Sequence, residues 1–149
     1  MLVLHLFVLQ QRLKAAGEAG ARAGRALAEL FVAEMDNALR EMGVGDMGIP
    51  RRVKQAAEAY NGRLIAYGKA VAEGDPVVIE AALARNVFGQ AAAPSAGNPG
   101  PARLSAHLRA AIDAVGKQPT EAILDGKVAF PRPMPSRASN AHRPEQDQP

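Results

Sequence analysis

The chain has 149 residues, of which 48% are hydrophobic and only 4% aromatic, and its formal net charge is +3. This length suffices for one domain with its own core, and the absence of cysteine excludes disulfides, thiolate metal sites and cysteine nucleophiles. The weak basic excess is typical of a solubilising surface, with a nucleic-acid or ribosome surface as the alternative.

The first predicted element is a helix over residues 2–15, where leucines recur at helical spacing. They are Leu2, Leu6, Leu9 and Leu13. The start of this helix is apolar on nearly all sides, which is typical of a buried helix, and we expect residues 1–13 to expose apolar surface in the isolated chain. The apolar run at residues 1–9 is shorter than the roughly 20 residues of a membrane span, and it lacks the features of a signal peptide. We therefore expect a soluble protein.

Residues 17–24 (GEAGARAG) predict either a turn or a loosely formed start of the next helix, because glycine recurs there. The helical pattern is firm over residues 25–42. Its apolar stripe is Leu27, Leu30, Phe31, Met35, Ala38, Leu39 and Met42. Asp36 and Arg40 are four residues apart, which predicts an ion pair. Paired catalytic acids, Asp36 and Asp46, are the less economical interpretation.

A glycine-rich loop at residues 43–48 matches the pattern G-x-G-x-x-G. That pattern binds dinucleotides where it follows a strand, whereas here it follows a helix. We predict an interhelix turn in which Gly43 and Gly45 are structural and at least one has a positive φ. The N–H groups of the loop and of the next helix start can also hold a carboxylate, such as that of Asp46.

The next helix is predicted from Pro50 to Gly74, both of which are preferred residues at such positions. Its apolar seam is Val53, Ala57, Tyr60, Leu64, Tyr67 and Val71. The cations Arg51, Arg52 and Lys54 flank this seam at the helix N-terminus, where the helix dipole disfavours positive charge. We predict that they point to solvent and are candidate partner-binding residues.

Two further arginines, Arg63 and Arg85, are expected to be partly buried in ion pairs with acids such as Asp36, Asp46 or Glu58. Arg63 lies at the edge of the apolar seam, where a guanidinium can form two parallel hydrogen bonds to a carboxylate. Exposure of Arg85 beside the basic group is the alternative. Exposed cations should then serve recognition and buried cations stability.

The predicted elements after Gly74 are, in order, a helix over residues 75–89, a flexible loop over residues 91–102, a helix over residues 102–118, one turn over residues 120–124 and an extended segment over residues 127–130. The Pro-rich tail after Pro131 has almost no apolar residues, so we expect disorder. The fold class is all-α: a compact bundle of five or six helices at residues 1–130, then a tail at residues 131–149.

Catalytic and metal-binding patterns are missing from the sequence. The histidines His5, His107 and His142 are far apart in the chain, and no pattern suggests that they converge on a metal. No Ser–His–Asp arrangement or glycine-flanked serine is present. We therefore expect a protein that is not an enzyme and that has no cofactor.

Several ordered blocks resemble the ubiquinol–cytochrome c chaperone family: LVLHLF at the start, EMDNALREMGVGDMGIPRRVK, NGR and AY within residues 61–67, AALARNVFG, and GKVAFP near the end. The resemblance covers residues 2–131. It implies an all-helical protein without cofactors that binds newly made cytochrome b until haem insertion and assembly of respiratory complex III proceed. Mitochondrial relatives also work beside the ribosome exit tunnel with a small helper protein.

By position, the resemblance marks eight family-pattern residues: Asp36, Arg40, Gly43, Gly45, Asp46, Arg63, Arg85 and Asn86. Asn61 stands where a second aromatic residue is common in the family. Family members usually have helical sequence before the LVLHLF block, so we expect an N-terminally incomplete bundle. No Arg/Ser-rich leader is present, which suits a bacterial protein in the cytoplasm or associated peripherally with the cytoplasmic face of the inner membrane.

Two other functions compete with a cytochrome b chaperone. One is a ribosome- or RNA-associated factor that uses the basic helix at residues 51–63, and the other is a plain structural subunit. Phosphate binding falls steeply with ionic strength, whereas binding to an apolar client does not. Salt dependence therefore separates the first two functions.

Overall fold

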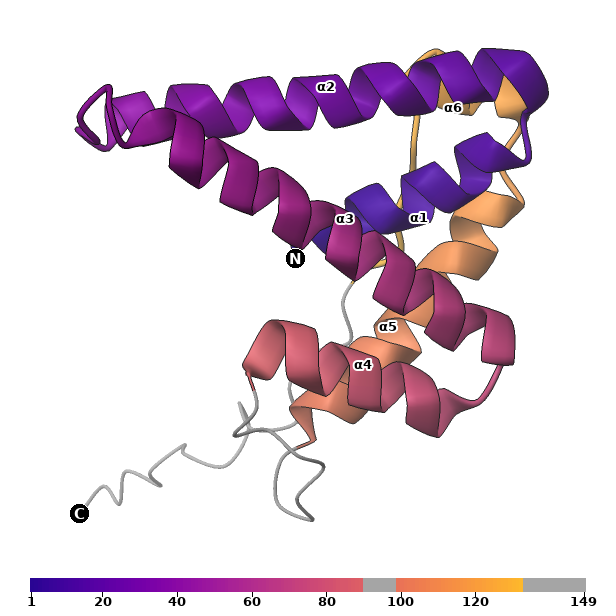
Figure 1. Ribbon diagram of the computed structural model, residues 1–149. Helices are drawn as coiled ribbons and strands as arrows, with labels where there is room; N and C mark the ends of the chain where they lie inside the picture. The colour runs from indigo at the N-terminus through magenta and orange to yellow at the C-terminus, as the bar shows by residue number, and fades with distance from the viewer. Residues whose placement is uncertain (90–98, 133–149) are drawn as a thin grey trace, which may run out of the picture.

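A computed structural model describes residues 1–89 and 99–132, and every regular element in these ranges is a helix (Figure 1). The six helices are α1 (Leu2–Lys14), α2 (Gly17–Glu41), α3 (Ile49–Glu73), α4 (Pro76–Phe88), α5 (Gly100–Gly116) and α6 (Thr120–Leu124). The predicted all-α fold class is confirmed. Residues 127–130, predicted to be extended, form neither a helix nor a strand.

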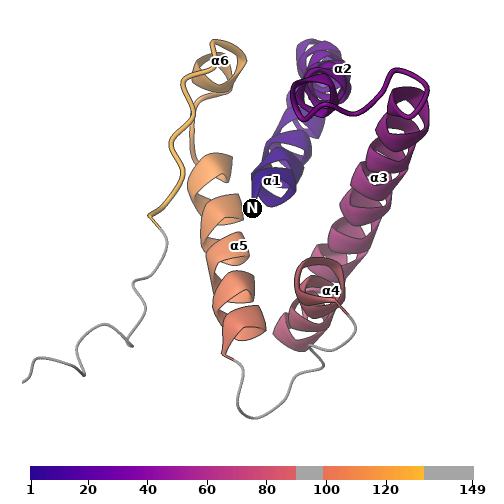
Figure 2. The ribbon, with the colours of Figure 1, turned by 90° about the vertical axis from the view of Figure 1, so that its left-hand side faces the viewer.

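Helix α1 lies at the centre of the bundle, between α5 and α3, with α2 packed along it (Figure 2). Its buried side chains are Leu4, Leu6, Phe7, Val8 and Leu13. All of these except Leu6 meet Leu83 of α4 and Leu108 of α5 in the main core, whereas Leu6 packs with Phe31 and Tyr60 in a second cluster. Removal of this apolar surface from water is the main stabilising contribution. The most exposed apolar side chains of residues 1–13 are Met1 (61%) and Leu2 (58%). The expected exposure of apolar surface is therefore found at the very start of this segment.

Of the two predicted alternatives, the helical start is observed: the glycines before residue 25 belong to α2, which starts at Gly17, and Gly17 itself has a positive φ of 64° after a turn at residues 15–16. Gly20 and Gly24 are buried against α1. A Cβ atom at Gly20 would overlap the carbonyl oxygen of Leu13, and one at Gly24 would meet the Gln10 side chain. The glycines are therefore there because the two helices approach closely.

Helices α2 and α3 form a long hairpin whose tip lies far from α4 and α5 in Figure 1. The predicted seam of α3 faces inward, with Tyr60 and Tyr67 buried. Tyr60 stacks on Phe31 of α2 with ring centroids 4.6 Å apart, and Tyr67 meets Phe7 of α1 edge-on at 5.6 Å. The rings thus join α3 to both α2 and α1.

The later helices differ from the sequence-based prediction mainly at their ends. The Asp75 carboxylate accepts a hydrogen bond from the Val77 N–H at 2.8 Å, as expected of a helix cap. Helix α5 starts at Gly100, two residues earlier than predicted, so residues 100–102 are helical. The remainder of the predicted flexible loop, except Pro99, and the predicted disordered tail beyond residue 132 lie outside the described residues. None of the helices in the described ranges is long and apolar enough to cross a membrane.

Candidate functional site

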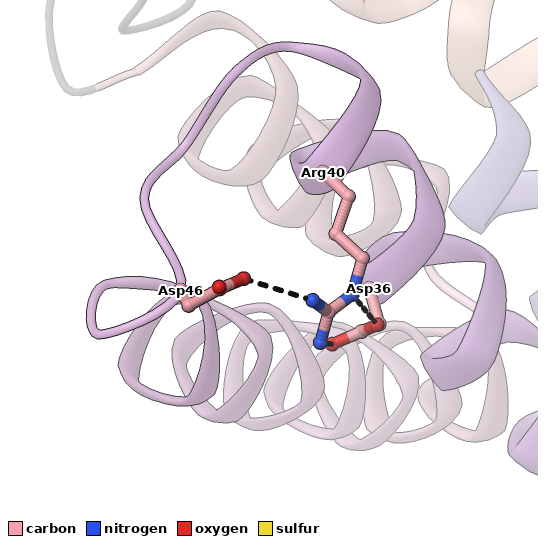
Figure 3. Close-up of polar contacts among 3 residues, drawn as sticks. All are labelled: Asp36, Arg40 and Asp46. Atoms are coloured by element: carbon pink, nitrogen blue, oxygen red, sulfur yellow. Dashed lines mark hydrogen bonds and ion pairs between the residues drawn. The ribbon is translucent and has the colours of Figure 1, made fainter.

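The tip of the α2–α3 hairpin carries a small charged cluster (Figure 3). Arg40 Nε donates to Asp36 Oδ2 at 2.7 Å, which confirms the predicted ion pair, and Arg40 Nη1 donates to Asp46 Oδ1 at 3.1 Å. The hydrogen bond and charge of Asp36, assisted by Asp46, raise the pKa of Arg40. All three side chains remain at least one third exposed. Such pairs add little stability in water, so the cluster chiefly orients the loop.

Gly43 ends α2 with a positive φ of 75°. The N–H of Gly43 donates to the carbonyl of Arg40 at 2.9 Å, and the N–H of Val44 donates to the carbonyl of Leu39 at 3.1 Å. These two hydrogen bonds form a Schellman motif. The prediction of at least one positive φ is confirmed at Gly43. Gly45 does not have a positive φ and its Cβ position is open, although its carbonyl accepts a hydrogen bond from the Gly48 N–H within the turn at 2.8 Å.

Asp46 does not hold the start of α3. The N-cap position is Gly48, which has no side-chain hydrogen bond, and the Asp46 carboxylate binds Arg40 instead. The suggestion that the loop and helix start hold this carboxylate is therefore wrong. A guanidinium six residues earlier offers a full charge, which attracts the carboxylate more strongly than the partial charge of a helix end.

Three cations and two methionines project from the tip, and we call these five residues the tip surface. Arg51, Arg52 and Lys54 are exposed, as predicted, and among described residues the only acid within 4.0 Å of their charged groups is Glu58, beside Lys54. Met42 and Met47 are 70% and 99% exposed. The tip surface combines positive charge with apolar side chains.

The ion pairs predicted for Arg63 and Arg85 are not formed with any acid of the described chain. Arg85 is exposed and Arg63 is half-buried. Of the acids proposed as partners, the two aspartates bind Arg40 at the hairpin tip, and Glu58 lies beside Lys54. The acids that the sequence analysis proposed as partners of Arg63 and Arg85 therefore lie closer to other cations.

Arg63 instead lines a cavity of about 260 Å3, together with Tyr67 of α3 and Asn86 of α4. Val87, Leu104 and residues 1–4 complete the walls. Burial raises the pKa of Tyr67, and the nearby charge of Arg63 opposes this change. Two of the eight family-pattern residues, Arg63 and Asn86, thus meet here, whereas Asp36, Arg40 and Asp46 meet at the tip.

A second hollow lies along the hairpin between α2 and α3, with a volume of about 440 Å3. We call it the hairpin groove; its lining residues are Ala28, Glu29, Val32, Ala33, Ala57, Tyr60 and Asn61. The sequence analysis missed it. The available signal was the run of alanines at facing positions on the two helices, which leave room between the backbones.

Two histidines that the sequence analysis left apart meet where α1 packs on α5. The Nε2 atoms of His5 and His107 are 3.4 Å apart, and the Phe130 ring packs edge-on against His5. Burial, followed by the charge of His5, lowers the pKa of His107. The described residues contain no group of three or more potential metal ligands, and His142 lies outside them.

Comparisons with known proteins place the chain in a family. The sequence profile described as Ubiquinol-cytochrome C chaperone matches residues 1–130. Among solved structures, the crystal structure of the Cbp3 homolog from Brucella abortus matches with a TM-score of 0.74 and 31% identity, over 89% of this chain and 71% of that chain. A comparison with curated proteins finds no match. The chain belongs to the ubiquinol–cytochrome c chaperone family.

Proposed function

We propose that the chain is an assembly factor that binds newly made cytochrome b and supports the biogenesis of the ubiquinol–cytochrome c reductase complex. The observation that carries this proposal is the family match over residues 1–130, supported by the shared fold of the Cbp3 homolog. The function needs an exposed client-binding surface and neither a catalytic residue nor a cofactor. It would act in a bacterial cytoplasm, at the face of the membrane that receives the client.

The hairpin offers such a surface. Its groove is lined mainly by small apolar side chains and a tyrosine, and Leu30 and Ile65 are also more than half exposed on the same two helices. Exposed apolar surface of this kind marks sites where another protein binds. A membrane protein before insertion presents apolar segments, which would gain from contact with the groove.

The cations of the tip surface favour a second candidate, a ribosome- or RNA-associated factor. Arg51 and Arg52 have no acid partner among the described residues, and Lys54 has only the distant Glu58. The two functions are compatible if a helper protein or the ribosome binds the tip while the client occupies the groove. They differ in salt dependence, because only phosphate contacts release counterions.

Co-purification from a membrane-containing lysate tests the proposal. Tagged wild-type chain should recover cytochrome b at both low and high salt. Ala33→Glu, which adds a second carboxylate to the groove beside Glu29 and replaces part of its apolar lining, should reduce recovery at least about tenfold. Ala26→Glu, at an exposed position of α2 outside the groove lining, should not. Recovery of ribosomal proteins without cytochrome b would refute the client assignment and favour the second candidate.

A further inference from the structure

The cavity beside Arg63 combines polar groups with apolar walls. Its polar groups come from α3 and α4, and its apolar side comes from Val87, Leu104 and the start of α1. At about 260 Å3 the cavity is slightly smaller than a typical site for a drug-sized ligand. Its size suits one side chain of a protein rather than a large cofactor.

The polar groups in this cavity have unused hydrogen-bonding capacity. Arg63 is half-buried and has no acid partner in the described part of the chain. Tyr67 is only 2% exposed and lines the cavity, and its hydroxyl is not among the enclosed polar atoms of the described chain that lack a partner, so it is open to the cavity. The Asn86 amide donates to the carbonyl of Ala82 at 2.8 Å, which fixes this side chain at the edge of the cavity.

A carboxylate is the group that satisfies these residues best. The Arg63 guanidinium carries a full positive charge without a carboxylate partner in the described chain, and a carboxylate can accept two parallel hydrogen bonds from it. The Tyr67 hydroxyl can donate to the same carboxylate, because it is protonated at neutral pH. The walls formed by Val87 and Leu104 suit an aliphatic stem.

We propose that this cavity binds an acidic side chain carried on an apolar segment of the client protein. The identification of the client as the source of the carboxylate rests on the proposed function. The preference for a carboxylate rests on the charge of Arg63. It predicts that the client is recognised by one acid among apolar residues, in addition to apolar contact along the hairpin.

The first arm of the test uses a small probe and needs no client. Hexanoate should bind the full chain and shift the NMR signals of the Arg63 side chain and the Tyr67 ring, whereas the uncharged hexanamide should bind at least about tenfold more weakly. Arg63→Gln should abolish this preference, and Tyr67→Phe, which keeps the ring that packs on Phe7, should reduce it about fivefold. Arg109→Gln removes an exposed charge outside the cavity lining and should change nothing.

The second arm measures recovery of cytochrome b with the same folded variants. If wild type and Arg109→Gln recover the client and Arg63→Gln recovers at least about tenfold less, the inference is supported. If hexanoate binds at Arg63 but recovery is unchanged, the cavity is a site for free carboxylates only and the inference is wrong. Absence of any preference for hexanoate also refutes it. If hexanoate binds but the wild-type chain does not recover cytochrome b, the proposed function is refuted. The client is then also refuted as the source of the carboxylate.

Discussion

The two ends of the α2–α3 hairpin are held in different ways. Near α1, the hairpin is fixed by buried contacts: Gly20 lies against Leu13, and Phe31 stacks on Tyr60. At the tip, an arginine and two carboxylates that are 36% and 89% exposed orient a glycine turn in water. Burial therefore stabilises one end, whereas local backbone geometry and charge only shape the other.

This difference separates stability from recognition. The base of the hairpin uses its side chains to build the core and has few left for a partner. The tip surface contributes little to the core, so its cations and methionines are free to contact other molecules. Variants along one hairpin can therefore test which end determines folding and which end determines binding.

Truncation of the base should have the largest effect on stability. Phe31→Ala removes a buried ring and its stacking on Tyr60, and should lower the free energy of unfolding by about 3–5 kcal/mol. Chemical denaturation monitored by circular dichroism measures this value. The neighbouring Leu30 is 57% exposed, so Leu30→Ala should cost less than about 1 kcal/mol. Equal losses for the two variants would show that the hairpin base is not packed as described.

A single methyl group at the α1–α2 contact should have the next largest effect. Gly20→Ala forces the two helices apart, because the new Cβ would overlap the Leu13 carbonyl, and should cost about 1–3 kcal/mol. Gly62→Ala is the matched control in α3, where the Cβ position is open. It should stabilise the protein by about 0.5–1 kcal/mol, since alanine is the better helix former. Stabilisation by both substitutions would contradict the close approach of α1 and α2.

The turn at the tip should be less sensitive than the base. Gly43→Val places a β-branched residue at a φ of 75° and should cost about 1–2 kcal/mol through backbone strain. Gly45→Val should be nearly neutral in the same denaturation experiment, because Gly45 has no positive φ and its Cβ position is open. A larger loss at Gly45 than at Gly43 would reverse our assignment of the turn.

Local sequence patterns predicted the hairpin well. Spacing of four residues predicted the Asp36–Arg40 pair, and a glycine after an apolar stripe predicted the turn at Gly43. Both depend on residues close in the chain, so elementary rules of helix geometry suffice. The same rules assigned the inward seam of α3 and the all-α class.

Contacts between distant segments were the part that the sequence did not reveal. Gly20 looked like a helix breaker because its partner, Leu13, can be recognised only after α1 and α2 have been placed together. The expected partners of Arg63 were wrong because Asp36 and Asp46 bind Arg40, and Glu58 lies nearer to Lys54. The contact between His5 and His107 likewise depends on the packing of α1 against α5. Tertiary packing decides each of these cases.

Lowering the pH should destabilise the packing of α1 against α5 but should not affect the hairpin tip. The pKa of His107 is lowered in the folded state. Neutral His107 therefore contributes stability above the unfolded-state pKa of about 6.5, and this contribution is lost as the pH falls from about 6.5 through the lower folded-state pKa. Hydrogen exchange between pH 7 and pH 5 should show lost protection in α1 and α5. The loss of protection should be smaller in His107→Gln, because glutamine does not titrate. The exchange rates at the hairpin tip should show no change that depends on His107. Unchanged protection of α1 and α5 in wild type would contradict the expected coupling.

Charge removal at the tip should have the smallest effect on folding and a clear effect on binding. Replacement of Arg51, Arg52 and Lys54 together by Gln should leave the free energy of unfolding within about 1 kcal/mol of wild type, because exposed charges contribute little. The same variant should lose capture of anionic partners at low salt, since the cations attract them over a distance that salt shortens. Thermal melts and co-purification at two salt concentrations measure the two effects. The control, Arg22→Gln in α2, breaks an exposed ion pair with Glu18 outside the tip surface and should change neither. A triple variant that unfolds easily yet binds normally when folded would show that the tip stabilises the bundle, and that recognition resides nearer α1.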